Sequence, residues 1–311
     1  MKNRFLRGGP RRGSSASARR ARRGLALAAA VLGAAALAVP ATLQAQSPLC
    51  LGVSAKSPEA RLMAFYAAPL AFSTAAQPVQ LRPWQWQFSI DITPMPSPDS
   101  ARRATQCYSA SKGESTNLAS IFPRPRVALG LPYNLIVEAS YLPPITVKDA
   151  TPNLFGLSLA WTQRVWVFAG SSVIAQARVH TTLGYVEGPI TCGLGALQAD
   201  PTKPCYGTKP SNDRFTPNVT GAELVGTFDA FDYAMYAGVG VNSINAEFQV
   251  DFLDKNGFRD RSKVTLGSWL NRFAFLVGGT WRVAKTVDLT AQIYSQPDDV
   301  SMARIIMAWR P

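Results

Sequence analysis

Histidine and cysteine are scarce in this chain: His180 is the only histidine, and there are four cysteines among 311 residues. The cysteines show no CxxC spacing and no histidine-rich stretch accompanies them, which is unlike the usual pattern of a zinc site. We therefore expect no metal site and no cofactor. A lone histidine without a nucleophile motif is weak evidence for catalysis, so we expect that the protein is not an enzyme.

Long apolar runs are also missing after the first 45 residues, where no segment reaches the roughly 18 residues that a membrane-spanning helix needs. The N-terminus differs: residues 1–23 carry nine basic residues and no acid, and Leu25–Ala41 is apolar. Ala45 then supplies a small residue at a plausible cleavage point. This order predicts a secretory signal peptide over residues 1–45. A signal anchor is the alternative, which the short apolar run disfavours.

The basic charge of the chain comes mainly from that leader. Without its nine basic residues, 23 of the 32 lysines and arginines remain against 19 acids, a net charge near +4 instead of +13. A nucleic-acid-binding protein is therefore not expected. We expect an exported protein in a Gram-negative-type envelope.

Alternation of apolar and polar residues is the main pattern of the mature chain. In Trp84–Thr93, two tryptophans, a phenylalanine and two isoleucines alternate with polar residues. Successive side chains of a strand point to opposite faces, so one face of this strand is aromatic and apolar. A lipid-facing strand with an aromatic girdle has this pattern.

The segment Phe231–Phe252 contains two such runs on either side of Asn242 and Ser243, which predicts a β-hairpin with its turn at those two residues. Ten strands are expected in all. Their ranges are 84–93, 126–131, 134–142, 154–164, 173–187, 231–241, 244–252, 273–283, 286–294 and 300–310.

The connections between these strands sort by length. Short turns are expected near 132–133, 165–172, 242–243 and 284–285, and longer polar loops at 94–125, 143–153, 188–226 and 254–271, with a short one at 295–299. Short turns at one end and long loops at the other are typical of an outer-membrane barrel. We therefore predict an all-β fold, an antiparallel up-and-down transmembrane β-barrel of about ten strands over residues 84–311. A secreted β-sandwich is the alternative.

Residues 46–83 form an N-terminal extension before the first strand. Ser57, Pro58 and Glu59 are a helix-start pattern, and Pro69 is expected to end that helix. We expect this extension to act as a short helical plug. Both chain ends are placed at the end of the barrel that has the short turns.

The four cysteines of an exported chain suggest disulfides. Cys192 and Cys205 lie thirteen residues apart in one predicted loop, so we expect them to pair. By elimination, Cys50 pairs with Cys107.

Polar residues on the inward parity of the strands are candidates for the lumen. This set is Gln85, Asp91, Glu138, Gln176, Arg178, His180, Asp232, Glu247, Gln249, Asp251, Arg282, Asp288, Gln292 and Arg304. Mixed charge of this kind indicates either a selective polar path or a salt-bridged filling, and the filling is commoner in narrow barrels.

Several short motifs support a family resemblance. They are Tyr66-Ala67-Ala68-Pro69-Leu70, Gly130-Leu131-Pro132, Tyr141-Leu142-Pro143-Pro144 and Phe155-Gly156-Leu157. With them the chain resembles an uncharacterised family of bacterial outer-membrane β-barrel proteins and, more distantly, the fatty-acid and hydrocarbon porins that carry an N-terminal plug. The end, Trp309-Arg310-Pro311, departs from the terminal aromatic residue common in such barrels.

The resemblance implies a barrel and assigns no reaction and no ligand residues. We expect a porin-like protein of the outer membrane, in contact with its lipid, that passes or binds a small solute, apolar or polar. A structural or surface-interaction barrel with long extracellular loops is the alternative. The sequence sets no oligomeric state.

Overall fold

The computed structural model describes residues 50–99, 102, 107, 121–147, 149–168, 171–230 and 233–311. The predicted signal peptide and the candidate Asp232 lie outside the described residues. No helix in the described part of the chain has the length and apolar character that crossing a membrane requires.

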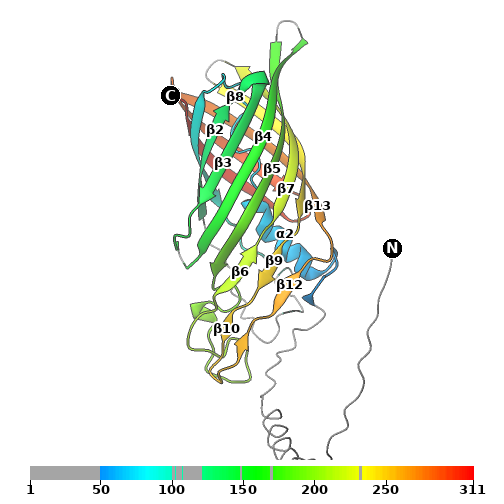
Figure 1. Ribbon diagram of the computed structural model, residues 1–311, viewed down its shortest axis with the longest axis vertical. Coiled ribbons are helices and arrows are strands. Elements are labelled where there is room, and N and C mark those ends of the chain that lie inside the picture. Colours follow the sequence, from blue (N-terminus) through cyan, green and yellow to red (C-terminus); the bar gives the residue numbers. More distant parts are fainter. Residues whose placement is uncertain are drawn as a thin grey trace, which may run out of the picture. The chain divides into compact units, whose positions relative to one another are not determined.

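Ten strands of the described chain form a closed antiparallel barrel (Figure 1). They are β1 (Trp86–Pro94), β2 (Ile121–Gly130), β3 (Leu135–Leu142), β4 (Thr151–Phe168), β5 (Ser171–Gly188), β7 (Val219–Ala230), β8 (Tyr233–Ile244), β13 (Leu270–Ala284), β14 (Val287–Gln296) and β15 (Val300–Trp309). The ring includes the pairing of β1 with β15 and that of β5 with β7. The predicted antiparallel barrel of ten strands is confirmed.

The alternation of side chains gives the wall an apolar outer face and a more polar inner face. In β8, Met235 is 66% exposed, whereas its neighbour Tyr236 is 2% exposed. Tryptophan, phenylalanine and aliphatic residues on the other barrel strands are exposed in the same way. The period of two that predicts strands in the sequence therefore also sets which side chains face outward.

The connections between barrel strands differ in length at the two ends. At what we call the turn end, residues 131–134, 169–170, 231–232 and 285–286 join neighbouring strands. At the other end, called the loop end, the connections are residues 95–120, 143–150, 189–218, 245–269 and 297–299. The expected sorting of short and long connections is present. The turn expected at 242–243 lies at 231–232, and the loops expected at 188–226 and 254–271 are 189–218 and 245–269.

The hairpin predicted over Phe231–Phe252 is wrong. Asn242 and Ser243 lie inside β8, and residues 231–232 separate β8 from its partner β7. The predicted loop 188–226 accordingly contains the start of β7. This strand was missed because its outward positions include Thr220, Ala222 and Gly226, so its alternation of apolar and polar residues is weak. The strand count stayed at ten because β7 takes the place of the predicted strand 244–252.

Two long connections pack together beyond the barrel as a loop module, residues 189–218 and 245–269. Its strands β6 (Asp213–Thr216), β9 (Glu247–Gln249) and β12 (Lys263–Thr265) continue the barrel sheet from β5. The module also contains a short helix, η3 (Leu194–Ala196), and the β10 (Phe252–Leu253) and β11 (Arg259–Asp260) pair. Phe215, Phe248 and Val264 are buried in its core.

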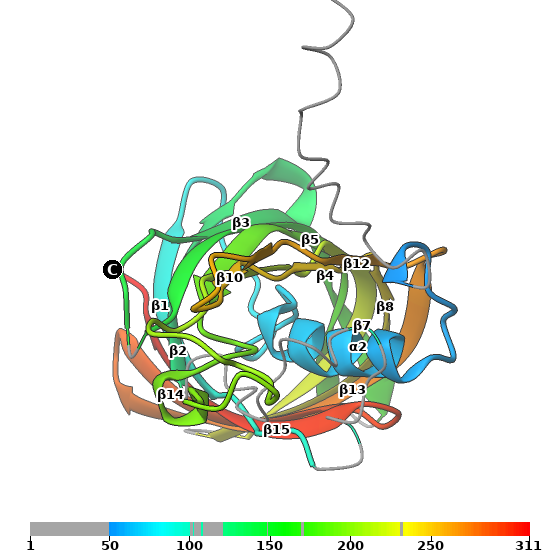
Figure 2. The ribbon, with the colours of Figure 1, turned by 90° about the horizontal axis from the view of Figure 1, so that it is seen from below.

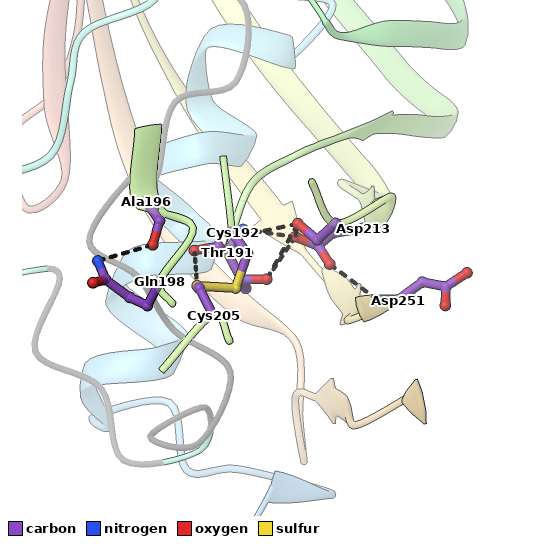
Figure 3. Close-up of a disulfide and its surroundings, with 8 residues drawn as sticks. Thr191, Cys192, Ala196, Gln198, Cys205, Asp213 and Asp251 are labelled. Atoms are coloured by element: carbon purple, nitrogen blue, oxygen red, sulfur yellow. Dashed lines mark hydrogen bonds between the residues drawn. A yellow bond between two sulfur atoms is a disulfide. The ribbon is translucent and has the colours of Figure 1, made fainter. Parts of the chain in front are cut away.

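A disulfide joins Cys192 to Cys205 in the loop module, as predicted (Figure 3). Beside it, Asp213 is buried and accepts hydrogen bonds from the backbone N–H of Thr191 at 2.6 Å and of Asp251 at 3.0 Å. Burial raises the pKa of the Asp213 carboxyl above its usual range, and these hydrogen bonds oppose that rise. The Asp213 carboxylate thus joins β6 to both connections of the module, and the disulfide closes a loop within the first of them.

The chain preceding β1 runs through the barrel from the loop end to the turn end. Val53 pairs with Leu266 of the loop module, and helix α2 (Pro58–Leu70) follows. Figure 2 shows α2 within the ring of strands. Near the turn end, the backbone N–H of Trp84 donates to the carbonyl of Gly130 at 2.7 Å. The two ends of the barrel, at Trp86 and Trp309, lie at the turn end as expected, and the described residues that precede the barrel begin at the loop end.

Local sequence explains the limits of α2. The Ser57 hydroxyl accepts a hydrogen bond from the N–H of Ala60 at 3.1 Å, and Pro58 occupies the first turn. The helix passes Pro69 and ends one residue later, at Leu70. The predicted helix is present, and it ends slightly later than expected because the last turn accommodates the proline.

Replacing Cys192 and Cys205 with serine is expected to loosen the loop module and leave the barrel folded. Closing a loop of this size contributes about 3 kcal/mol by restricting the unfolded chain, but here the barrel already holds both ends of the connection. Chymotrypsin cleavage after Leu197 and Tyr206 of this loop should increase, while strand circular dichroism stays unchanged. Thr208→Ala, an exposed change in the same loop, is the control; loss of strand signal in the double variant would contradict the expectation.

Peptide mapping without reduction checks the second cysteine pair. The Cys50 thiol lies 3.6 Å from the backbone carbonyl oxygen of Cys107. Burial and the Cys50 thiol raise the pKa of Cys107. The pairing of these two residues stays a prediction, and a Cys50–Cys192 peptide would contradict it.

Candidate functional site: the barrel lumen

The lumen is occupied by residues 70–83, which we call the lumen segment. Its backbone carbonyls accept hydrogen bonds from arginines of the wall. On β2, Arg124 donates to the carbonyls of Leu70 at 2.9 Å and Ala71 at 3.2 Å, and Arg126 donates to that of Ser73 at 3.0 Å. Contacts of this type bind the main chain, so they depend on the path of the segment more than on its side chains.

Phe72 is the main side chain of the lumen segment to face these arginines. Arg178 on β5 donates to the Phe72 carbonyl at 3.0 Å. The guanidinium carbons of Arg126 and Arg178 lie 4.5 Å and 5.1 Å from the centre of the Phe72 ring, and that of Arg124 lies 5.9 Å from it. The ring is fully buried, so these cation–π contacts form in a site away from water, where they are strongest.

Thr74 attaches the lumen segment to the opposite side of the wall. Its backbone N–H and its hydroxyl both donate to the Glu223 carboxylate, at 2.8 Å and 2.7 Å. Gln292 on β14 donates to the Thr74 carbonyl at 2.8 Å. Arg304 on β15 donates to the hydroxyl of the preceding residue, Ser73, at 2.6 Å. The segment is thus held by strands on all sides of the barrel.

An ion-pair cluster closes the remaining space next to Phe72. Arg126 pairs with Asp91 at 2.8 Å and with Glu138 at 3.4 Å, and Glu138 pairs with Arg178 at 2.7 Å. Removing one member of such a buried cluster leaves an uncompensated charge, which typically costs about 3–5 kcal/mol. The charged lumen residues thus form a salt-bridged filling. Of the two arrangements expected from the sequence, a selective polar path and a salt-bridged filling, the filling is the commoner in narrow barrels.

His180 belongs to a second polar group. Its Nε2 atom lies 3.0 Å from the Asn242 side-chain oxygen, and its Nδ1 atom lies 3.9 Å from the Glu223 carboxylate. Asn242 donates to the Tyr294 hydroxyl at 2.6 Å. Within the described chain no hydroxyl or thiol is hydrogen-bonded to His180, so no nucleophile and base pair is assembled there. That the protein is not an enzyme stays a prediction.

Among the lumen candidates, the structure brings one group together around the lumen segment and its wall. These residues are Asp91, Glu138, Gln176, Arg178, His180, Gln292 and Arg304, all on barrel strands. Gln176 donates to the Thr162 hydroxyl at 3.2 Å and contacts no described atom of the segment by a hydrogen bond.

Other candidates lie elsewhere. Glu247, Gln249 and Asp251 are in the loop module, where Glu247 pairs with Lys263 at 2.7 Å and Asp251 with Arg259 at 2.6 Å. Their assignment to the lumen is wrong, because the strand predicted there belongs to the sheet beyond the barrel.

Gln85, Arg282 and Asp288 lie at the turn end. The Gln85 side chain accepts a hydrogen bond from the backbone N–H of Arg82 at 3.1 Å, which stabilises the turn before β1. Asp288 is buried and pairs with Arg310 and, at 3.9 Å, with Arg282. These three residues therefore lie around the turn-end opening of the barrel and not at its centre.

Sequence reasoning missed Arg124, Arg126 and Glu223. Pro123 and Pro125 made residues 121–125 unlike a strand. In the structure, these residues pair with β1 alone, because pairing with β3 begins at Arg126. The alternation of proline with arginine is a signal for an inward basic face that the sequence does contain.

Two cavities adjoin the lumen segment. One has about 50 Å³ and lies between residues 74–81 and the wall, where Glu138 and Arg178 line it. The other, at the turn end, has about 540 Å³ and is open. The described residues contain no group of three or more His, Cys, Asp or Glu side chains able to hold a metal.

No protein-family model matches this sequence. No curated protein matches it either. Among solved structures, the chain is similar to the attachment invasion locus protein Ail of Yersinia pestis, with 10% identity, a TM-score of 0.27, and coverage of 74% of this chain and 99% of Ail.

Two further structures are similar at the same level. The translocator domain of the autotransporter NalP from Neisseria meningitidis has 8% identity and a TM-score of 0.29, covering 81% of this chain and 95% of that domain. The copper transporter OprC has 9% identity and a TM-score of 0.28, covering 75% of this chain and 43% of OprC. At these values, the activities of the three proteins do not transfer to this chain.

A side chain at Gly156 is expected to displace Phe72 from the lumen. A Cβ atom there would lie 2.7 Å from the Phe72 ring. Overpacking of this kind typically costs about 1–3 kcal/mol, so Gly156→Val should lower the free energy of unfolding and speed hydrogen exchange in residues 70–76.

Combining Gly156→Val with Phe72→Ala should cost less than the sum of the two single changes, because the valine then fills the vacated space. Gly195→Ala is the control, since a Cβ there meets no atom within 4 Å. Strict additivity in the double variant would contradict the contact.

Proposed function

We propose that this chain is an outer-membrane β-barrel that binds or passes a small solute, with residues 58–83 acting as its plug. The observation that carries the membrane location is the outer face of the wall, which is apolar on every part of the ring. Its large exposed side chains include Phe88, Leu159, Val179, Leu224, Met235, Val239, Phe275, Val277, Ile293, Ile305 and Met307. A water-exposed surface rarely presents so wide an apolar belt.

Aromatic side chains near the turn end support the same proposal. Trp86, Trp281 and Trp309 are about half exposed on three barrel strands. The rings of Trp86 and Phe88 stack at 6.4 Å, and those of Phe88 and Trp309 at 5.7 Å. Aromatic residues form such girdles where a barrel meets the boundary between lipid and water.

The sorting of connections supports one orientation in the membrane. Short turns of outer-membrane barrels face the periplasm and long loops face outward. With that orientation, the loop module and residues 50–57 lie on the outer side, and the lumen segment emerges toward the periplasm at residues 82–85. The helix α2 then closes the barrel from the outer side.

The lumen contacts favour a closed resting state. The guanidinium groups of β2 and β5 occupy the space around Phe72, and the inner cavity of about 50 Å³ holds no more than a few waters. Passage therefore requires that residues 71–83 shift. The charged wall favours a polar solute over an apolar one.

A second function is favoured by the loop module. Its disulfide-linked surface exposes Leu194, Leu253 and Phe258, each more than half exposed. Exposed apolar residues on a rigid support are typical of a surface that contacts a partner. A non-transporting surface-interaction barrel is therefore the alternative.

An epitope inserted after Ser47 is expected to be accessible on intact cells, whereas one added after Pro311 should be labelled only after the outer membrane is opened. The reason is that Val53 lies at the loop end and Trp309 at the turn end. Antibody binding before and after permeabilisation measures this. If only the C-terminal epitope were labelled on intact cells, the proposed orientation would be overturned. Recovery of the protein as a soluble periplasmic monomer would overturn the membrane location.

Deleting residues 46–83 is expected to raise the permeability of liposomes to small polar solutes, since it removes the segment that occupies the lumen together with its hydrogen bonds to the wall. Swelling rates of vesicles with the whole and shortened chains are compared, after heat-modifiable gel mobility has established that both are folded. The Cys192→Ser, Cys205→Ser variant is the control for a change outside the lumen. If the folded, shortened barrel admits no solute, the surface-interaction function is favoured.

A further inference from the structure

We propose that the open cavity at the turn end, which we call the vestibule, is a binding site for small multivalent anions such as tricarboxylates. This proposal deepens the proposed function, on which it rests, by giving the class of solute. The vestibule has about 540 Å³ and lies between residues 77–83 and the ends of the barrel strands. A space of this size accommodates a molecule of metabolite dimensions.

Charge is the first observation. The residues that line the vestibule include Arg82, Arg164, Arg282 and Arg310, and no acid is among them. The nearest carboxylate in the described ion pairs is that of Asp288, which is shared by Arg282 and Arg310. Two arginines are thus matched by one buried acid.

Arg82 and Arg164 carry the excess charge. Within the described residues neither has a carboxylate within ion-pair distance, and the guanidinium of Arg164 donates to the Ser172 hydroxyl at 3.3 Å. Both arginines are exposed. Guanidinium groups recognise carboxylates and phosphates through paired N–H donors, so a multivalent anion is the ligand that this lining matches.

The side-chain amide of Gln77 provides the second observation. Gln77 is 8% exposed, and its carbonyl oxygen is buried without a hydrogen-bond partner in the described chain. The same residue lines both the vestibule and the inner cavity of about 50 Å³. A buried acceptor of this kind requires a donor, which a water or a solute hydroxyl supplies.

The vestibule continues toward the lumen arginines. Gln77, Val79 and Leu81 line both cavities, and the inner one is lined by Arg178 together with its ion-pair partner Glu138. The excess positive charge therefore lies at the vestibule, on Arg82 and Arg164. The field of such a group raises the local concentration of anions.

Isothermal titration of the whole mature protein in detergent with citrate tests the site. Citrate is expected to bind at low ionic strength and to bind more weakly as salt increases, because exposed charges are screened. The Arg82→Gln, Arg164→Gln variant should bind citrate about tenfold more weakly, as expected for the loss of two exposed ionic contacts. Glucose, a neutral solute, should not bind.

The Arg214→Gln, Arg259→Gln variant is the matched control, because it removes two exposed arginines of the loop module and should leave citrate affinity unchanged. Absence of citrate binding to the unaltered protein, equal affinity in the Arg82→Gln, Arg164→Gln variant, or an equal loss in the control would each overturn the proposal. If citrate binds to the whole protein but the shortened barrel admits no solute, solute passage is overturned and the anion site stands. If the shortened barrel admits solute but citrate does not bind to the whole protein, the anion site is overturned and solute passage stands.

Discussion

Hydrogen bonding and ion pairing of the buried arginines are the constraint on which the rest of this structure depends. Arg124, Arg126, Arg178 and Arg304 are all buried inside the barrel. A buried charge without partners is too costly to keep, so each guanidinium needs acceptors. Asp91 and Glu138 supply some of them, and the carbonyls of residues 70–73 supply others. The wall and the lumen segment therefore require each other.

That mutual requirement explains how the N-terminal part of the chain is arranged. The lumen segment is covalently continuous with α2 at one end and with β1 at the other, so it spans the lumen instead of entering it from one side. The loop module covers α2, and Tyr66 of the helix packs edge to face on Phe215 of the module. The module and its disulfide are thus part of what holds the plug in place.

The position of polar residues along the strands explains which sequence predictions were right. Strong alternation in 84–93, 273–283 and 300–310 identified barrel strands, because the face toward the outside is uniformly apolar. The same logic failed at β7 and at the start of β2, where glycine, glutamate, proline and arginine occur. Those residues look like loop residues locally. The glutamate and the arginines lie on the inner wall, where the lumen segment supplies their partners, whereas the prolines of β2 are exposed on the outer face.

The sequence by itself determined most of the alternating strands, the sorting of most connections and the pairing of Cys192 with Cys205, since each follows from residues close together in the chain. The barrel expected from these strands closes by pairing β1 with β15, the first and the last of its strands. Only the tertiary structure decided which polar residues meet. Thr74 bonds Glu223 across 149 residues of sequence, and Gln292 bonds Thr74 across 218. No local pattern encodes these contacts, because they form only when a closed barrel surrounds the segment that precedes it.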